Sequence, residues 1–215
     1  SRYEVVALVR NEPTFRLVDV EYRICGDLSP RQEWTKQLTG VDVVIHTAAR
    51  AHVLNETAIN PLAAYRTLNV ESTLNLASQA AFQGVERFIF LSSIGVHGAT
   101  TKVNEALQAE DALKPHNAYS TSKMEAELGL YEIAKDTGME VVCIRPPLVY
   151  GPGVKGNFHS MLKWLSRGIP LPLGAIHNTR SLVGIDNLVD LIITTIDHPA
   201  AANQTFLVSD DEDIS

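Results

Sequence analysis

Short, uninterrupted apolar runs alternate along this chain with longer segments of helical pattern, and this alternation restricts the fold more than any other feature. The runs lie at Glu4–Val9, Val41–Thr47, Phe88–Ser93, Glu140–Ile144 and Thr205–Val208, with a weaker candidate at Phe15–Ile24. They are continuous rather than alternating, as is typical of strands that are covered on both faces. A strand-then-helix order predicts a parallel sheet with right-handed crossovers. The sequence therefore predicts an α/β fold, a doubly wound parallel sheet with helices on both faces.

The helical patterns between these runs have recognisable ends. Asn117 is a good N-cap and Gly138 a good stop for one helix, and Gly84 stops the helix before it. The four expected helices run from after Pro61 to about Ala81, from about Asn117 to Gly138, over Phe158–Arg167, and from about Asp186 to just before Pro199.

The segment Gly151–Leu182 differs from the rest in composition, because it carries five of the 13 glycines and three of the ten prolines. This composition favours a smaller, looser lobe beside the main sheet. We therefore expect a dinucleotide-binding type of domain over residues 1–150 and part of a second lobe over residues 151–215, with a helix and a strand that return to the main domain.

Charge and cysteine content exclude several classes of partner. The formal net charge is -7 and the pI is near 5.5, whereas nucleic acids and anionic membranes favour a basic protein surface. No stretch of about 18 apolar residues suggests a membrane span, and no Cys/His spacing suggests a metal site. Cys25 and Cys143 lie in apolar runs and are expected to be reduced and buried. We expect a cytoplasmic protein, although the chain begins with Ser1 and a targeting segment stays open.

Ligands of such sheets bind beyond the carboxyl ends of the strands. Small residues, Ala48 and Ala49, follow the run at 41–47, and small side chains let a ligand approach the backbone. Ser93 ends the next run, and Pro146 follows the run at 140–144. These residues are therefore candidates for one site.

Tyr119 and Lys123 are four residues apart, which places both side chains on one face of a helix. An ammonium group close to a phenol lowers the pKa of the phenol, so that tyrosine can act as a general acid or base. A second pair with the same spacing, Tyr131 and Lys135, lies about 18 Å further along the helix. Tyr131 is expected to be a packing or surface residue, whereas Tyr119 is at the helix end that comes from the edge of the sheet.

Several motifs occur in an order that resembles one family, the extended short-chain dehydrogenases/reductases in their NAD-dependent epimerase/dehydratase branch. The resemblance covers nearly the whole chain and rests on Gly26-Asp27-Leu28, His46-Thr47-Ala48-Ala49, Asn69-Val70, Leu91-Ser92-Ser93, Val96-His97-Gly98, Tyr119 through Lys123, Arg145-Pro146, Val149-Tyr150-Gly151-Pro152-Gly153 and Arg180. It implies a Rossmann-like fold, NAD or NADP as cofactor, a nucleotide-sugar substrate, and a homodimer formed through the helices at 61–83 and 117–137.

The resemblance also implies roles for single residues. Tyr119 would be the catalytic acid/base, Lys123 would hold the nicotinamide ribose and tune Tyr119, and Ser93 would bind the reacting sugar hydroxyl. The other cofactor-binding residues would be Arg10, Asp27, Leu28, Ala48, Ala49, Asn69 and Pro146, and the substrate diphosphate would meet Asn157 and Arg180. A surface arginine at 180 and a plain turn at 157 stay open as alternatives, and no residue is expected to bind a metal.

The chain also departs from the family pattern. The family opens with a strand and a glycine-rich phosphate-binding loop, whereas the first glycine here is Gly26 and Arg10 follows the first run. We expect a fragment that lacks this strand and loop and also the C-terminal end, with a slot between Tyr3–Val9 and Val41–Thr47 and impaired cofactor binding. Arg10 then occupies the position that selects between NAD and NADP. His97 replaces a tyrosine that is common in the family.

Three functions stay open on the sequence. The first is a 4-epimerase that oxidises and re-reduces a sugar hydroxyl, and the second is a reductase that acts once on a 4-keto nucleotide sugar. The third is a non-catalytic NAD(P)-binding or scaffold protein, because fold does not fix function. A dehydratase ranks lower, since Ile94 and Gly95 stand where an additional acid is needed.

Overall fold

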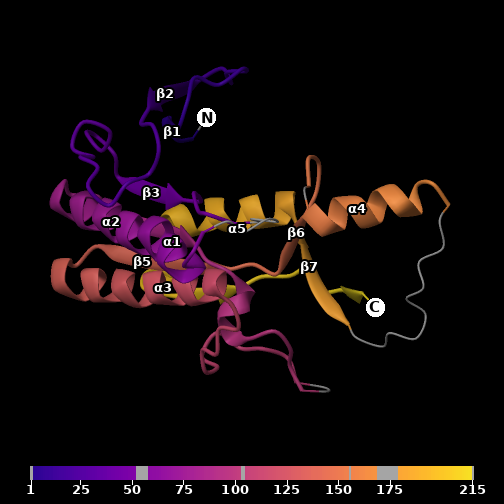
Figure 1. The fold of residues 1–215 in the computed structure, drawn as a ribbon. Coiled ribbons are helices and arrows are strands. Elements are labelled where there is room, and N and C mark those ends of the chain that lie inside the picture. Colours follow the sequence, from indigo (N-terminus) through magenta and orange to yellow (C-terminus); the bar gives the residue numbers. More distant parts are fainter. Residues whose placement is uncertain (1, 52–57, 103–104, 155, 169–178, 215) are drawn as a thin grey trace.

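A computed structural model describes residues 2–51, 58–102, 105–154, 156–168 and 179–214 of the chain (Figure 1). Its centre is a four-stranded sheet made of β3 (Val43–His46), β4 (Arg87–Leu91), β5 (Glu140–Arg145) and β8 (Thr205–Leu207), in that order. Every neighbouring pair in this sheet is parallel. The predicted parallel sheet is therefore confirmed, with strands at four of the predicted positions.

Helices cover both faces of this sheet. α2 (Ser72–Phe82) and α3 (Ala118–Thr137) lie side by side on one face, and α5 (Ile185–Asp197) lies on the other (Figure 1). Alternate residues of β4 point to opposite layers: Phe88 and Phe90 pack with α2 and α3, and Ile89 packs with α5. All three are buried, which explains why this run is continuously apolar.

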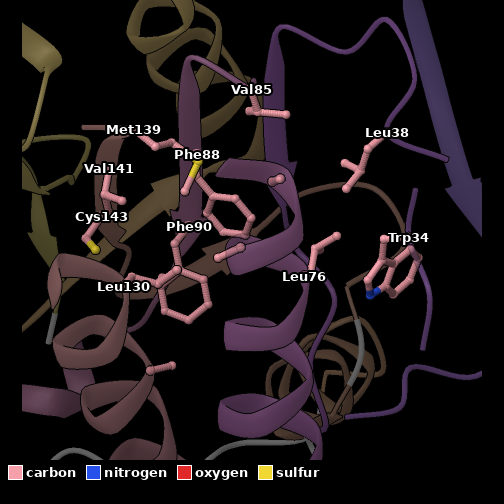
Figure 2. Close-up of a cluster of buried hydrophobic side chains, with 13 residues drawn as sticks. Trp34, Leu38, Leu76, Val85, Phe88, Phe90, Leu130, Met139, Val141 and Cys143 are labelled. Atoms are coloured by element: carbon pink, nitrogen blue, oxygen red, sulfur yellow. The ribbon is translucent and has the colours of Figure 1, made fainter. Parts of the chain in front are cut away.

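The larger core cluster fills the layer between the sheet and the helices α2 and α3. Figure 2 shows Phe88 and Phe90 of β4 beside Leu130 of α3 and Leu76 of α2. Trp34 and Leu38, from the segment between β2 and β3, extend the same cluster along α2. This dry layer fixes the position of α3 relative to β4.

The helical pattern that starts at Pro61 is not one regular helix. α1 (Pro61–Tyr65) is followed by a π-helical stretch, η1 (Arg66–Glu71), and then by α2. Asn60 caps α1 by accepting a hydrogen bond from the Ala63 N–H. Ser72 turns both its N–H and its hydroxyl to the carbonyl of Thr67, five residues earlier, which holds the wide turn. Such π-turns often occur at functional sites.

The N-terminal strands form a separate sheet. β1 (Val5–Val9) and β2 (Val20–Ile24) pair in parallel, and in the described ranges neither is hydrogen-bonded to β3. Figure 1 shows this pair above β3. The two regions therefore belong to separate sheets, as expected, and the slot between them stays a prediction. Only the last five residues of the candidate run Phe15–Ile24 form a strand.

A third sheet belongs to the C-terminal part and was not predicted. β6 (Leu148–Tyr150) is parallel to β7 (Arg180–Gly184), and β7 is antiparallel to β9 (Asp213–Ile214). α4 (Gly156–Leu165) extends from this region, and a short 3-10 turn, η3 (Pro199–Ala201), precedes β8. Among the helices that the structure describes, none combines the length and the apolar character that a membrane span needs.

Candidate active site

The segments that follow β3, β4 and β5 meet at one edge of the central sheet, which we call the carboxyl edge. The ladder between β4 and β5 continues past the strands, because the Ser92 N–H donates to the Ile144 carbonyl at 2.7 Å and the Ile94 N–H donates to the Pro146 carbonyl at 3.0 Å. Ser93 and Pro146 are thus on adjacent chain segments. Ala48 and Ala49 follow β3 at the same edge, and Ala48 is exposed.

Ser93 caps a 3-10 turn, η2 (Ile94–His97), and its hydroxyl accepts from the Gly95 N–H at 3.1 Å. The turn lies against the start of α3: a Cβ at position 95 would be 3.3 Å from the Ser93 hydroxyl and 3.4 Å from the Ser120 Cβ. Ser120 directly follows Tyr119. The fold therefore brings the Ser93 turn next to the helix turn that carries Tyr119, as the sequence predicted.

Tyr119 is on the first turn of α3. Asn117 and Ser120 form a capping box there, in which each side chain accepts from the backbone of the other. The Tyr119 ring is edge-on to Tyr65, with 6.2 Å between ring centroids. Burial raises the pKa of Tyr119 above its ordinary value, and Tyr65 raises it further. The expectation that Lys123 lowers this pKa is wrong for this structure.

The position of Lys123 explains why the pKa of Tyr119 is not lowered, because its ammonium group bonds to the end of β4 and not to the phenol. The side chain is 2% exposed, Nζ donates to the Leu91 carbonyl at 2.7 Å, and it lies 4.3 Å from the centroid of the Phe90 ring. Burial lowers the pKa of Lys123 to about 8, although Glu127 opposes this shift. A buried cation is therefore fixed at the end of β4, one helical turn from Tyr119.

Asn69 lies in the π-turn and is buried. Its side-chain oxygen accepts from the Arg50 N–H at 2.7 Å, and its Nδ2 donates to the Arg50 carbonyl at 3.1 Å and to the Ser122 hydroxyl at 3.0 Å. The amide thus joins the segment after β3 to α3. Its polar atoms are bonded within the protein, which indicates that Asn69 shapes the carboxyl edge.

Arg10 and Asp27 come together at the ends of β1 and β2. The Arg10 Nε is 2.6 Å from Asp27 Oδ1, and its Nη2 donates to Asp27 Oδ2 at 3.1 Å. Both side chains are well exposed, so the pair can separate at little free-energy cost. Leu28 is half-buried and packs on the larger core cluster. Two of the predicted cofactor residues are thus adjacent, on the sheet that stands apart from the carboxyl edge.

The two predicted substrate residues lie in the C-terminal part. Arg180 begins β7 and is exposed, and Asn157 is in α4 with a side chain outside the described residues. A hollow of about 300 Å³ occurs in this region, lined by Tyr150, Phe158, Leu182, Asp210 and Glu212. No contact in the described ranges connects Arg180 to Ser93 or Tyr119.

The remaining polar candidates have structural partners. The Tyr131 hydroxyl bonds to the Thr205 hydroxyl at 2.6 Å, which confirms that Tyr131 is a packing residue. His46 bonds to the Thr73 hydroxyl at 2.9 Å and burial lowers its pKa to about 3, so its role is structural. His97, which stands where the family commonly has a tyrosine, is buried and bonds to Arg145.

Sequence reasoning missed one buried group. Glu127 and Arg145 form an ion pair with both side chains at most 5% exposed, and Glu127 is close enough to Lys123 to affect its pKa. The available signal was spacing: Glu127 follows Lys123 by four residues, and hence Tyr119 by eight, on the same helix face.

Comparisons with known proteins agree with this geometry. Residues 1–209 match the family model described as "NAD dependent epimerase/dehydratase family". A UDP-glucose 4-epimerase of Vibrio cholerae is 53% identical over 191 residues, which cover 88% of this chain and 58% of that protein. The chain thus spans little more than half the length of this relative.

Solved structures show the same fold. UDP-glucuronic acid 4-epimerase from Bacillus cereus in complex with NAD superposes with a TM-score of 0.80 at 22% identity, over 93% of this chain and 63% of that one. MoeE5 in complex with UDP-glucuronic acid and NAD superposes with a TM-score of 0.82 at 25% identity, over 99% and 70% of the two chains. The Rossmann-like α/β architecture predicted from the sequence is confirmed.

Proposed function

The chain belongs to the NAD dependent epimerase/dehydratase family, and from that premise we propose that the protein is a nucleotide-sugar 4-epimerase. The substrate class is a nucleoside diphosphate sugar, with UDP-glucose and UDP-galactose as the first pair to test, because the 53% identical relative is a UDP-glucose 4-epimerase. The activity is the reversible inversion of the sugar C4 hydroxyl.

One observation carries the proposal: the Ser93 turn lies against the first turn of α3, where Tyr119 sits one helical turn from the buried cation of Lys123. A hydroxyl, a phenol and an ammonium group are thus fixed at the carboxyl edge. These are the groups required to bind an alcohol, to remove its proton and to stabilise the charge that develops.

The described residues fit the nicotinamide half of a dinucleotide. Ala48 and Ala49 give close access to the backbone at the carboxyl edge, Pro146 is buried beside the Ser93 segment, and Lys123 provides a cation for a ribose hydroxyl. We propose that Arg10 and Asp27, which pair at the ends of β1 and β2, meet the adenosine ribose. We propose that residues 1–150 hold the cofactor and that residues 151–215 form part of the substrate lobe. When bound, the nicotinamide supplies the acceptance and return of hydride.

The chain's own residues account for the proton. Ser93 donates a hydrogen bond to the C4 oxygen, and Tyr119 accepts the hydroxyl proton while the C4 hydrogen leaves with the C4–H electron pair as hydride, which leaves a C4 ketone. In the reverse step, the hydride returns to the opposite face of C4 and Tyr119 gives the proton back to the oxygen. Atoms and electrons balance over the cycle, and no net reductant is used.

Burial makes Tyr119 a weak acid in this structure, so the base form needs a nearby positive charge. Lys123 is the nearest cation on α3. To approach the Tyr119 hydroxyl, its ammonium group must weaken or break its hydrogen bond to the Leu91 carbonyl. We propose that ligand binding shifts the ammonium group toward Tyr119. The raised pKa of Tyr119 then falls only in the loaded enzyme.

A second copy of the chain is the proposed partner. α2 and α3 pack closely, because a Cβ at Gly129 would be 2.6 Å from the Leu74 side chain. Their outer face leaves Phe82 88% and Leu128 53% exposed. Apolar side chains at this exposure favour a helix-to-helix dimer, and Leu128→Asp is expected to yield a monomer by analytical ultracentrifugation. The free thiols Cys25 and Cys143 support a cytoplasmic location.

The test of the function is turnover by the whole protein with no added reductant. UDP-galactose should be converted to UDP-glucose with a catalytic amount of NAD or NADP, and the total of reduced cofactor should not change. Stoichiometric loss of reduced cofactor with a 4-keto nucleotide sugar would favour the one-way reductase instead. Cofactor binding without turnover of any nucleotide sugar would favour the scaffold protein.

A further inference from the structure

Three buried polar side chains lie directly beneath the carboxyl edge and have no part in the proposed proton transfer. They are His97, Arg145 and Glu127, which we call the buried triad, and they are 6%, 4% and 1% exposed. A buried cation and carboxylate are costly to desolvate, so such groups are retained only with well-matched partners.

Arg145 is the centre of the triad. Its Nε donates to both carboxylate oxygens of Glu127, at 3.1 and 3.2 Å, and its Nη2 donates to Glu127 Oε2 at 2.6 Å. Its Nη1 donates to the His97 Nε2 at 2.9 Å and to the Ala109 carbonyl at 2.8 Å. The charges of Arg145 and Glu127 cancel, and His97 fills the remaining side of the guanidinium group.

The triad connects three elements at the carboxyl edge: α3 with Tyr119 and Lys123, the turn that Ser93 caps, and the end of β5 before Pro146. Glu127 is on α3, on the face of Tyr119 and Lys123, and Arg145 ends β5 just before Pro146. His97 ends η2, the turn that Ser93 caps. The carbonyl of Val96, in the same turn, accepts from the Lys114 N–H at 2.8 Å, so η2 is also fixed to the loop before α3. Arg145 is thus the link between Ser93 and Tyr119.

The geometry sets the protonation state of His97. Because an arginine N–H can only donate, Nε2 must present its lone pair, so the imidazole is neutral with its proton on Nδ1, which is buried and has no hydrogen-bond partner among the described residues. The charged groups around the ring are Arg145, Glu127 and Asp111. Burial lowers the pKa of His97 and Arg145 lowers it further, against the opposing effects of Glu127, Asp111 and the Ala112 backbone. A protonated ring would place a second cation against the guanidinium group.

We propose that His97 is a positioning residue: neutral His97 completes the buried triad and thereby holds the Ser93 turn against α3, and protonation of His97 releases that turn. The catalytic consequence rests on the proposed function, whereas the structural consequence does not. The proposal predicts a loss of both stability and turnover as the pH falls below the ordinary pKa of histidine, about 6.5.

Two variants separate the acceptor from the charge. His97→Gln keeps a side-chain acceptor for Arg145 and cannot be protonated. His97→Leu removes the acceptor and fills a volume similar to that of the imidazole ring with an apolar side chain. Both are compared with the wild type in the whole protein. His46, the other buried histidine among the residues that the structure describes, is present in all three proteins and therefore cancels in the comparison.

The first measurement is unfolding as a function of pH, and it needs no substrate. The pKa of His97 is lower in the folded state than in the unfolded state, so below pH 6.5 the unfolded state binds more protons. The free energy of unfolding therefore decreases as the pH is lowered through this range. The folded-to-unfolded ratio of the wild type should fall relative to His97→Gln by up to about tenfold per pH unit below pH 6.5. Parallel curves for the two proteins would overturn the claim that the ring must be neutral.

The second measurement is kcat and KM against pH for the folded enzymes. His97→Leu should lower kcat about tenfold or more near pH 8 with little change in KM, and His97→Gln should restore kcat and remove the acid loss of turnover below pH 6.5. An acid limb that is the same in wild type and His97→Gln would overturn the positioning role. If no protein turns over any nucleotide sugar, the proposed function fails, and the unfolding curves still decide the role of the triad.

Discussion

The strands of the central sheet and of the β1–β2 pair were both predicted from apolar runs, but the two sheets differ in how deeply their side chains are buried. β4 and β5 are buried on both faces, between α2 and α3 on one side and α5 on the other (Figure 1). In the β1–β2 pair, Val5 and Ile24 are 45% and 55% exposed. An apolar run therefore indicates a strand, but not how completely the described residues cover it.

The same difference in burial separates the proposed catalytic residues from the residues proposed for the adenosine end of the cofactor. Ser93, Tyr119 and Lys123 are attached to the buried sheet and its helices, whose packing fixes their positions. Arg10 and Asp27 stand on the exposed pair and are held by one solvent-accessible ion pair. The part proposed for chemistry is thus held by buried packing, and the part proposed for the adenosine end of the cofactor is held by an exposed ion pair.

Matched isoleucines on the two sheets give the largest expected effect. Ile89→Ala in β4 should lower the free energy of unfolding by about 2–5 kcal/mol, because a buried side chain leaves a cavity. Ile24→Ala in β2 should cost less than about 1 kcal/mol. Denaturant unfolding of both variants measures this. Equal costs would mean that, in the whole protein, another surface covers the β1–β2 pair.

Lys123→Met is expected to increase stability, since the methionine fills a similar volume without a buried charge. The gain should be about 1–3 kcal/mol at pH 7. The folded pKa of Lys123, about 8, is below its unfolded value of 10.5, so the wild type should gain stability between pH 8 and pH 10.5 and the variant should not.

Exposed Lys135, on the same helix, is the control for this variant, and Lys135→Met should change stability by less than about 0.5 kcal/mol. A loss of stability in Lys123→Met at pH 7 would show instead that the bond to the Leu91 carbonyl outweighs the cost of burial.

The smallest effect is expected at the β1–β2 pair. Arg10→Ala should change the free energy of unfolding by less than about 1 kcal/mol, because its ion pair with Asp27 is exposed. It should leave the affinity for NAD within about threefold and weaken NADP binding about tenfold, since only NADP offers a 2′-phosphate to the guanidinium group. Calorimetry with both cofactors tests this. Equal weakening of both would show that Arg10 contacts a group that they share.

The sequence was sufficient to predict the sheet, its covering helices and the positions of Ser93 and Tyr119. These features follow from the hydrophobic periodicity and from where each residue stands relative to the end of a strand, and both can be recognised locally. It did not reveal that Lys123 bonds to Leu91, since that contact depends on how α3 packs over β4. The interruption of the helix by the π-turn at Arg66–Glu71 and the burial of His97 against Arg145 also depend on tertiary contacts. β7 begins with two exposed residues and β9 is only two residues long, so no apolar run marked them.

Two tyrosine-to-phenylalanine variants on α3 test whether Tyr119 is the proton-transfer group. Tyr119→Phe should lower kcat on UDP-galactose by about 10²–10⁴-fold with no large change in stability. Tyr131→Phe, which removes the hydroxyl bonded to Thr205, should keep nearly full turnover per folded molecule. If Tyr119→Phe retains turnover, or if the two variants lose it equally, Tyr119 is not the acid/base and the account of this site is contradicted.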